Sequence, residues 1–100
     1  MHVIKRKKTS RCTGSKIVYE YLLSDPIDTE FISILKNHGV MDSRQLGKLV
    51  FFSFHEGEWL SMKGMSGDNI VHVTHMKSDN KRAEEFINRV VQMHEKCTES

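Results

Sequence analysis

The sequence has few of the features that mark secreted or membrane proteins. It contains two cysteines in 100 residues, whereas a secreted domain of this size usually carries roughly four or more in a disulfide framework. Its apolar runs are short, as in residues 49–52, and a membrane-spanning helix needs about 20 apolar residues. The N-terminal region also lacks the apolar stretch of a signal peptide. We therefore expect a soluble, cytoplasmic protein without a membrane segment.

The sequence also lacks a recognisable catalytic or nucleotide-binding motif. Residues 64–67, with the sequence GMSG, place a serine between glycines. A nucleophile elbow requires a turn from strand to helix, and this segment lies between two predicted strands. The segment matches neither the Walker pattern nor the dinucleotide-binding glycine pattern. It therefore predicts a hairpin loop, with no catalytic residue and no cofactor.

The histidine spacing does not predict a metal site. His72 and His75 are three residues apart on a predicted strand, so their side chains should point to opposite faces of the sheet. His94 and Cys97 share one face of a predicted helix. Tetrahedral zinc would still need two ligands from elsewhere in the chain. We therefore expect no metal site.

The charges are unevenly distributed along the chain. Residues 1–16 contain six basic residues and no acidic residue, whereas residues 17–100 contain nine basic and thirteen acidic residues. A basic arm can bind phosphate backbones by releasing counterions. The candidate contacts are Lys5, Arg6, Lys7, Lys8 and Arg11. Because residues 5–16 contain no aromatic side chain that could stack on bases, we favour a solvated, disordered tail over residues 1–15.

The remaining chain has the size and composition of one domain. Its length of 100 residues and its 38% hydrophobic content suit a single core. We expect this domain to span residues 16–97, followed by a frayed end at 98–100.

The first half of the domain predicts a strand and then a helix. Residues 16–24 alternate in hydrophobicity, which is typical of a strand. Asp25 and Pro26 suit an N-cap and the first helical position, respectively. Gly39 suits a left-handed cap at the end of this helix. The apolar positions with helical spacing are Ile27, Phe31, Ile34 and Leu35.

The second half predicts three strands and a final helix. The strands cover residues 46–54, 58–63 and 70–76, and their short connections require an antiparallel meander. Gly57 is expected to supply the positive φ of the first hairpin. The final helix should run from about residue 80 to residue 95, because apolar residues recur there at helical spacing. Residues 40–45 fit either a loop or a short edge strand.

These elements predict an α+β fold with two helices on one face of an antiparallel sheet of four to five strands. The order is β-α-β-β-(β)-β-α. If residues 40–45 form a strand, the order of elements is similar to half of the TATA-binding-protein fold. That resemblance concerns element order alone and implies no function.

The second face of the sheet suggests how the domain could act. We expect Phe51, Trp59, Val71 and Val73 to form an exposed patch there, and such patches usually mark a protein partner or a homodimer. The leading hypothesis is therefore a non-enzymatic interaction module that self-associates through this face or through a sheet edge.

Two other classes of function remain open. A nucleic-acid-binding domain would use the basic arm on phosphates and Trp59 or Phe51 for base stacking. An enzyme or ligand-binding protein would instead have a pocket between helix and sheet, near Tyr21, His55 or His72.

Overall fold

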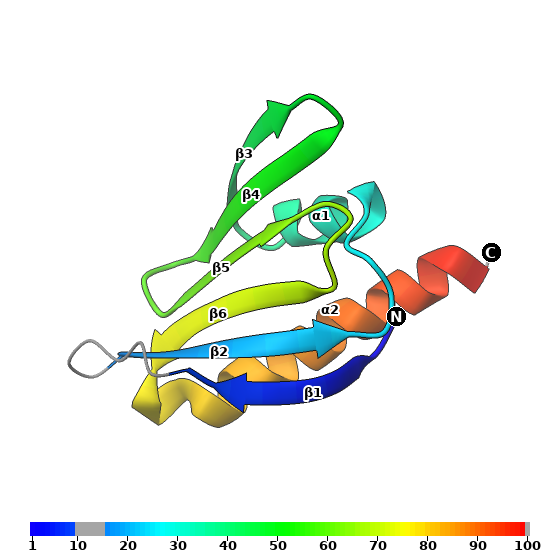
Figure 1. Ribbon diagram of the computed structural model, residues 1–100. Helices are drawn as coiled ribbons and strands as arrows, with labels where there is room; N and C mark the ends of the chain where they lie inside the picture. The colour runs from blue at the N-terminus through cyan, green and yellow to red at the C-terminus, as the bar shows by residue number, and fades with distance from the viewer. Residues whose placement is uncertain (10–15, 100) are drawn as a thin grey trace.

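The computed structural model describes residues 1–9 and 16–99, with side chains described as far as residue 95. Figure 1 shows one antiparallel sheet with two helices packed on the same face. The elements are β1 Val3–Lys8, β2 Lys16–Leu23, α1 Thr29–Lys36, β3 Val40–Leu46, β4 Leu49–Glu56, β5 Leu60–Met65, β6 Ile70–Met76, a 3₁₀ turn at Lys77–Asp79, and α2 Asn80–Glu99.

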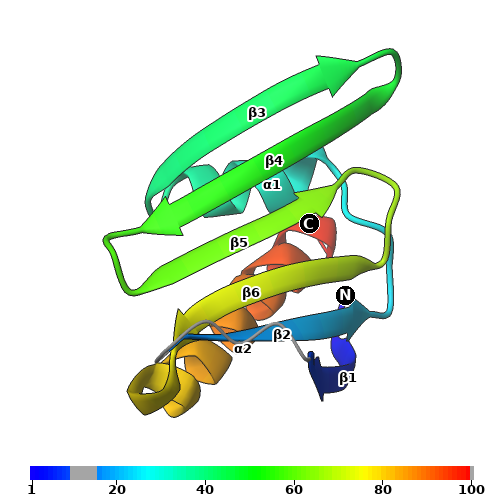
Figure 2. The same cartoon turned by 60° about the vertical axis from the view of Figure 1, so that its left-hand side comes forward.

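The sheet has six strands in the order β1-β2-β6-β5-β4-β3. Strands β4, β5 and β6 are consecutive neighbours, which confirms the predicted antiparallel meander. Strand β2 pairs with β6, so helix α1 carries the chain across the sheet from β2 to β3 at the far edge (Figure 2). The α+β prediction is confirmed, and residues 40–46 form a strand.

Strand β1 corrects the prediction that residues 1–15 form a disordered tail. Residues 3–8 pair with β2, with Lys5 opposite Leu22 and Lys7 opposite Glu20. The side chains of Met1 and Val3 also contribute to the core. An edge strand tolerates several charged residues because water reaches one of its edges. The lysine-rich sequence of residues 3–8 therefore did not look like a strand. Residues 10–15 lie outside the described part of the chain.

The first helix begins later than predicted. Its N-cap is Asp28, whose Oδ1 accepts a hydrogen bond of 2.9 Å from the Phe31 N–H, whereas Asp25 and Pro26 precede the helix. The helix ends at Lys36, and Gly39 does not have a positive φ, so the predicted left-handed cap is wrong. Gly57 does have a positive φ, of 57°, as predicted for the hairpin.

Gly39 is needed for a close approach between strands rather than for its backbone conformation. A Cβ atom at this position would lie 2.4 Å from the backbone oxygen of His55 and 2.9 Å from the ring of Phe54. A backbone oxygen cannot move aside as a flexible side chain can. The absence of a side chain at Gly39 therefore allows β3 to start beside the end of β4.

The core lies between the sheet and the two helices. Its main buried side chains are Tyr21, Leu23, Phe31, Ile34, Leu35, Phe52, Phe54, Leu60, Met62, Val71, Val73, Ala83, Phe86, Ile87, Val90 and Val91. The apolar stripe predicted for the final helix is therefore buried as far as side chains are described. Helix α2 continues to Glu99, past residue 95 where the sequence predicted its end.

Three members of the predicted exposed patch face the helices instead. Val71 and Val73 are fully buried, and Trp59 is half-buried with its ring centroid 6.3 Å from that of Phe86 in α2. Both alternating sets of residues in β6 contain apolar side chains, so the sequence did not distinguish the buried face from the open one. The predicted patch therefore does not exist as a unit.

The close approach at Gly39 predicts the effect of adding one methyl group. We expect Gly39→Ala to lower the free energy of unfolding by about 1–3 kcal/mol, because the new Cβ would overlap the His55 oxygen. Urea unfolding followed by circular dichroism measures the change. Ser43→Ala, at an exposed position of β3, should change it by less than about 0.5 kcal/mol. Stabilisation by Gly39→Ala would contradict the described packing.

Candidate functional site

The sheet face that points away from the helices carries no covering element among the described residues (Figure 2). Side chains that alternate with the buried ones, and that lie opposite one another in the strand register, form this open face. Its members are Lys5, Lys7, Lys16, Val18, Glu20, Leu22, Val40, Asp42, Arg44, Leu46, Leu49, Phe51, Ser53, His55, Ser61, Lys63, Met65, Ile70, His72, Thr74 and Met76. Most of them are polar.

The open face is positively charged. Its basic side chains are Lys5, Lys7, Lys16, Arg44 and Lys63, whereas its acidic side chains are only Glu20 and Asp42. One row of register partners crosses all six strands, and it consists of Lys7, Glu20, His72, Lys63, Ser53 and Asp42. Within this row, the Nε2 atom of His72 lies 3.3 Å from Oε1 of Glu20.

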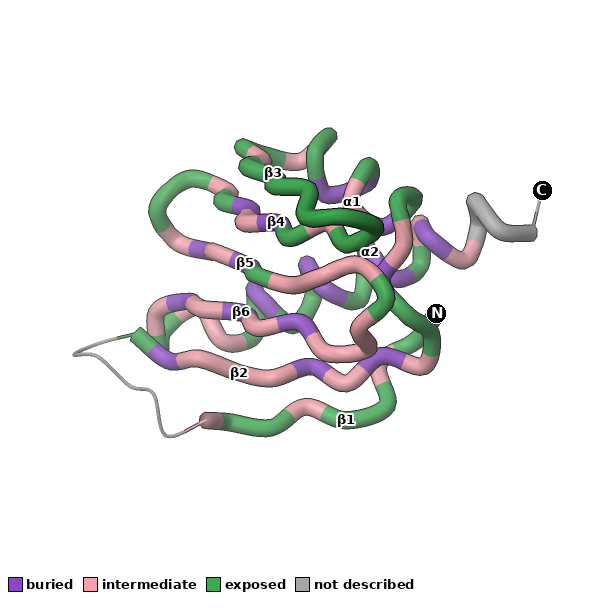
Figure 3. Tube along the Cα trace, turned by 45° about the horizontal axis from the view of Figure 1, so that its top comes forward, coloured by how far each residue is buried: buried purple, intermediate pink, exposed green. Residues whose placement is uncertain are grey.

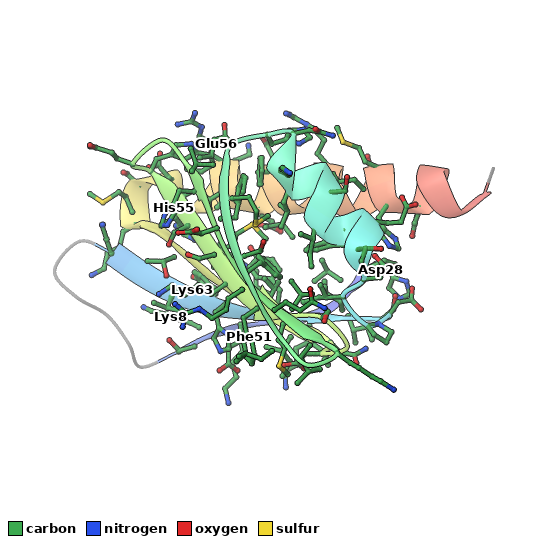
Figure 4. The ribbon with its side chains drawn as sticks, turned by 90° about the horizontal axis from the view of Figure 1, so that it is seen from above. Lys8, Asp28, Phe51, His55, Glu56 and Lys63 are labelled. Atoms are coloured by element: carbon green, nitrogen blue, oxygen red, sulfur yellow. The ribbon has the colours of Figure 1, made fainter. Side chains whose placement is uncertain are left out.

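Phe51 is the member of the predicted patch that does lie on the open face. Its side chain is 40% exposed, and its register partners are Arg44 on β3 and Met65 on β5. A shallow groove of about 580 Å³ runs beside it, lined also by Ser53 and Lys63. Figure 4 labels Phe51 and Lys63 on the neighbouring strands β4 and β5. The groove therefore combines the exposed Phe51 ring with the cations Arg44 and Lys63 and with the carboxylate of Asp42.

The predicted basic arm does not form a single phosphate-binding surface. Arg6 faces α2, with its guanidinium carbon 3.9 Å from the centroid of the Tyr19 ring, and it contacts Asn80 and Glu84. Lys5 and Lys7 point to the open face, whereas Lys8 is the register partner of Tyr19 on the helix side. Arg11 lies outside the described residues. The structure thus separates Arg6 from Lys5 and Lys7.

Arg6 also lies near a buried phenol. Tyr21 is fully buried beneath α2, and the guanidinium of Arg6 lies 5.6 Å from the centroid of its ring. Burial raises the pKa of the Tyr21 hydroxyl, and the nearby charge of Arg6 offsets only part of that increase. Tyr21 is therefore a neutral core residue near neutral pH, and Arg6 packs against the domain instead of extending into solvent.

The histidines and cysteines do not assemble into a metal site within residues 1–9 and 16–95. The described side chains contain no group of three potential ligands. His72 lies on the open face, and His75 is buried on the helix face beside the Tyr19 ring, so the prediction that they point to opposite faces is confirmed. The side chain of Cys97 is not among those described.

The residues suggested for an enzyme pocket are also separated. Tyr21 is buried on the helix side, whereas His55 and His72 lie on the open side of the sheet. His55 lines a second groove of about 480 Å³ at the end of the sheet, together with Trp59 and Ser61. Tyr21 and His72 do not line this groove. The structure therefore does not bring the three residues together.

A carboxylate and an imidazole form the tightest described ion-pair geometry in the helical layer. The Nε2 atom of His94, on α2, lies 3.0 Å and 2.9 Å from the two carboxylate oxygens of Asp28. Asp28 also caps α1, which begins beside α2 (Figure 4). The pair was not predicted, because its members are 66 residues apart in the chain. Its geometry connects the start of α1 with α2.

The environment of Asp28 changes its acidity. Burial acts to raise the pKa of its carboxyl group, but hydrogen bonds from the Phe31 N–H and from His94, together with attraction by His94, outweigh burial. The pKa of Asp28 is therefore lowered. A lowered pKa in the folded state means that the ionised carboxylate stabilises the fold.

The β3 edge is the second unusual surface. Every residue of β3 except Met41 is exposed (Figure 3), and Val40 and Leu46 are 71% and 58% exposed. Strand β3 pairs only with β4, so its outer backbone groups have no strand partner in the described chain. Val40, Leu46, Leu49 and Phe51 place four exposed apolar side chains on this hairpin. The sequence pattern of residues 40–45 fitted either a loop or a strand, so it did not predict this edge.

Comparison with known proteins does not assign the chain to a family. No protein-family model, curated protein or solved structure matches it. Among the described residues, neither helix has the length and apolar character that crossing a membrane requires. The open face and the β3 edge are therefore the surfaces that indicate a function.

The lowered pKa of Asp28 predicts how stability depends on pH. Above the ordinary aspartate pKa of about 4, the ionised carboxylate should stabilise the fold, and this contribution is lost as the pH falls through the lower folded value. We expect Asp28→Ala to cost about 1–3 kcal/mol at neutral pH, because the helix cap and the partner of His94 are both removed.

Urea unfolding at several pH values measures this contribution. The difference between the parent protein and Asp28→Ala should shrink as the pH falls from about 5 to about 2.5. Glu30→Ala, which removes an exposed carboxylate from the same helical turn, is the control and should cost less than about 1 kcal/mol. A difference that does not depend on pH would contradict a stabilising role for the ionised carboxylate.

Proposed function

We propose that the protein is a non-enzymatic interaction module that forms a homodimer by antiparallel pairing of β3 with β3 of a second copy. The single observation that carries this proposal is the sequence of β3, VMDSRQL, which is complementary to itself when two copies run antiparallel. Exposure of β3 and its unpaired outer edge support the same conclusion. The small number of cysteines supports a location in the reducing cytoplasm.

The complementary register is centred on Ser43. In that register Asp42 lies opposite Arg44 of the second copy, and Val40 lies opposite Leu46. The two-fold axis repeats each of these pairs, so the interface contains two ion pairs and two apolar pairs. Opposite charges and apolar side chains facing each other across antiparallel strands contribute roughly 0.2–1 kcal/mol per pair. The exposed apolar ends of β3 would therefore be covered while its charged centre is neutralised.

The other edge of the sheet is protected against the same kind of pairing. Strand β1 carries four consecutive basic residues, at 5–8, and no acidic residue. Two such strands would place like charges opposite each other, and natural proteins use edge lysines to prevent this association. Strand β3 instead carries one acidic and one basic side chain at positions that pair with each other. The contrast favours β3 as the edge that associates.

The proposed dimer keeps the layers of each copy aligned. A two-fold axis perpendicular to the sheet, between the two Ser43 residues, places both open faces on one side and all helices on the other. The contact is one seven-residue strand pair. Interfaces of this small size are usually transient, so we expect a dissociation constant on the order of micromolar.

A charge-swap experiment tests the register directly. Sedimentation equilibrium should give twice the chain mass of 11.6 kDa at high protein concentration. Asp42→Arg and Arg44→Asp should each weaken the dimer about tenfold or more, because each change places two pairs of like charges opposite each other. The double variant Asp42→Arg/Arg44→Asp restores opposite charges and should recover the parent dissociation constant.

The control is Lys5→Glu on β1, which reverses a charge at the other edge and should leave the dissociation constant unchanged. All of the substituted positions are exposed, so circular dichroism should show unchanged folding. A parent protein that stays monomeric at millimolar concentration would contradict the proposed dimer. A dimer in which the double swap fails to rescue the single variants would contradict the Ser43-centred register.

A further inference from the structure

Trp59, Val71 and Val73 lie on the helix side, so the open face lacks three of the four apolar residues expected there. Its strand residues then include five basic side chains against two acidic ones. Its exposed apolar side chains Val40, Leu46 and Leu49 lie at the β3 edge, whereas the centre of the face is mainly polar and basic around the Phe51 ring. The helix-side position of Trp59 and the two valines therefore changes which ligand the face suits.

We propose that the open face binds single-stranded nucleic acid, with Phe51 stacking on a base and Lys63 and Lys7 contacting phosphates. Aromatic rings set within a basic groove are the usual chemistry of proteins that bind single strands. The groove beside Phe51 contains Arg44 on one side and Lys63 on the other. A stacked base and its flanking phosphates would contact both kinds of group.

The basic residues follow a path across the sheet. Lys63 on β5 and Lys7 on β1 belong to the same row of register partners, with β6 and β2 between them. Strands in a sheet lie about 4.8 Å apart, so these two lysines are separated by about 14 Å. Lys5 extends the basic surface along β1. A nucleic-acid strand running across the sheet from Phe51 would therefore meet cations at both ends of its path.

The features of the face favour a single strand over a duplex or a membrane. Bases in a duplex are already stacked and paired, so Phe51 could not stack on them without unstacking the helix. A membrane surface accepts apolar side chains of any kind together with cations, whereas a base stacks specifically on an aromatic ring flanked by cations. Phe51 is such a ring, and its exposed fraction of 40% leaves its surface available to a base.

The proposal is separate from the proposed dimer. Pairing of two β3 strands uses their outer backbone edges and leaves both open faces uncovered, although the proposed Asp42–Arg44 pairs border the groove beside Phe51. The monomeric Asp42→Arg variant should therefore still bind nucleic acid, and the added positive charge should not weaken its affinity. Loss of dimerisation and loss of nucleic-acid binding are thus distinguishable outcomes.

Fluorescence anisotropy with labelled mixed-sequence 15-nucleotide DNA and RNA tests the proposal. The full chain should bind single strands at low salt, and the affinity should fall steeply as salt rises. Lys7→Glu/Lys63→Glu should weaken binding about tenfold or more and flatten the slope of log affinity against log salt by about 1.4, for two lost phosphate contacts. The control Lys81→Glu/Arg89→Glu changes the net charge equally on the exposed side of α2 and should cost less than about threefold.

A second set of variants tests stacking independently of charge. Phe51→Leu keeps an apolar side chain but removes the ring, and it should weaken binding about fivefold or more, whereas Phe51→Tyr should keep the parent affinity. Circular dichroism checks that each variant folds. Equal loss in the α2 control, or no loss in Phe51→Leu, would overturn the proposed site. Absence of single-strand binding, equal binding to duplex DNA, or binding only to phosphatidylserine vesicles would overturn the proposed ligand.

Discussion

The fold of this protein depends on the burial of one face of its six-stranded sheet beneath two helices. Side chains in a strand alternate between faces, so each residue that enters this core sends its neighbour to the opposite side. Burial of Val71 and Val73 therefore leaves His72 and Thr74 on the open face. The same constraint in β4 buries Phe52 and Phe54 and exposes Phe51. The character of the open face is thus a consequence of what the helices cover.

The two edges of this sheet have different chemistry. Strand β1 is rich in cations and joins the body through β2 and through Arg6, which contacts Tyr19 and α2. Strand β3 is exposed on both faces and has both charge signs near its centre. Charge repulsion protects the first edge against pairing with a copy of itself, whereas the second edge has no such protection. This difference supports the proposed self-association through β3.

The helical layer fixes which side of the sheet is available. Asp28 caps α1 and accepts hydrogen bonds from His94 of α2. This contact connects two helices that are far apart in the sequence. Trp59 packs against Phe86 and lies near the guanidinium of Arg82, 4.0 Å from its ring centroid. These contacts keep the largest aromatic side chain on the helix side. The proposed edge for a second copy and the proposed basic face therefore lie on one domain and meet at Asp42 and Arg44.

Local patterns in the sequence were sufficient for much of the fold. Alternation identified β2 and the β4–β6 meander, and helical spacing identified the buried stripe of α2 that includes Phe86 and Val90, because each of these patterns arises within one element. The sequence predicted the positions of the candidate site residues less accurately. Phe51, Lys5 and Lys7 lie on exposed surfaces as expected, whereas Trp59, Val71, Val73 and Arg6 face the helices.

Contacts between distant segments determined the rest. Both alternating sets in β6 contain apolar residues, so only packing against α2 selected Val71 and Val73 for the core. The lysine-rich sequence of β1 did not predict a strand, because this strand depends on pairing with β2. In the same way, β3 depends on its pairing with β4. The contact between Asp28 and His94 joins two helices that lie far apart in the sequence. Periodicity shows which residues share a face, but the partner that covers that face is a property of the folded chain.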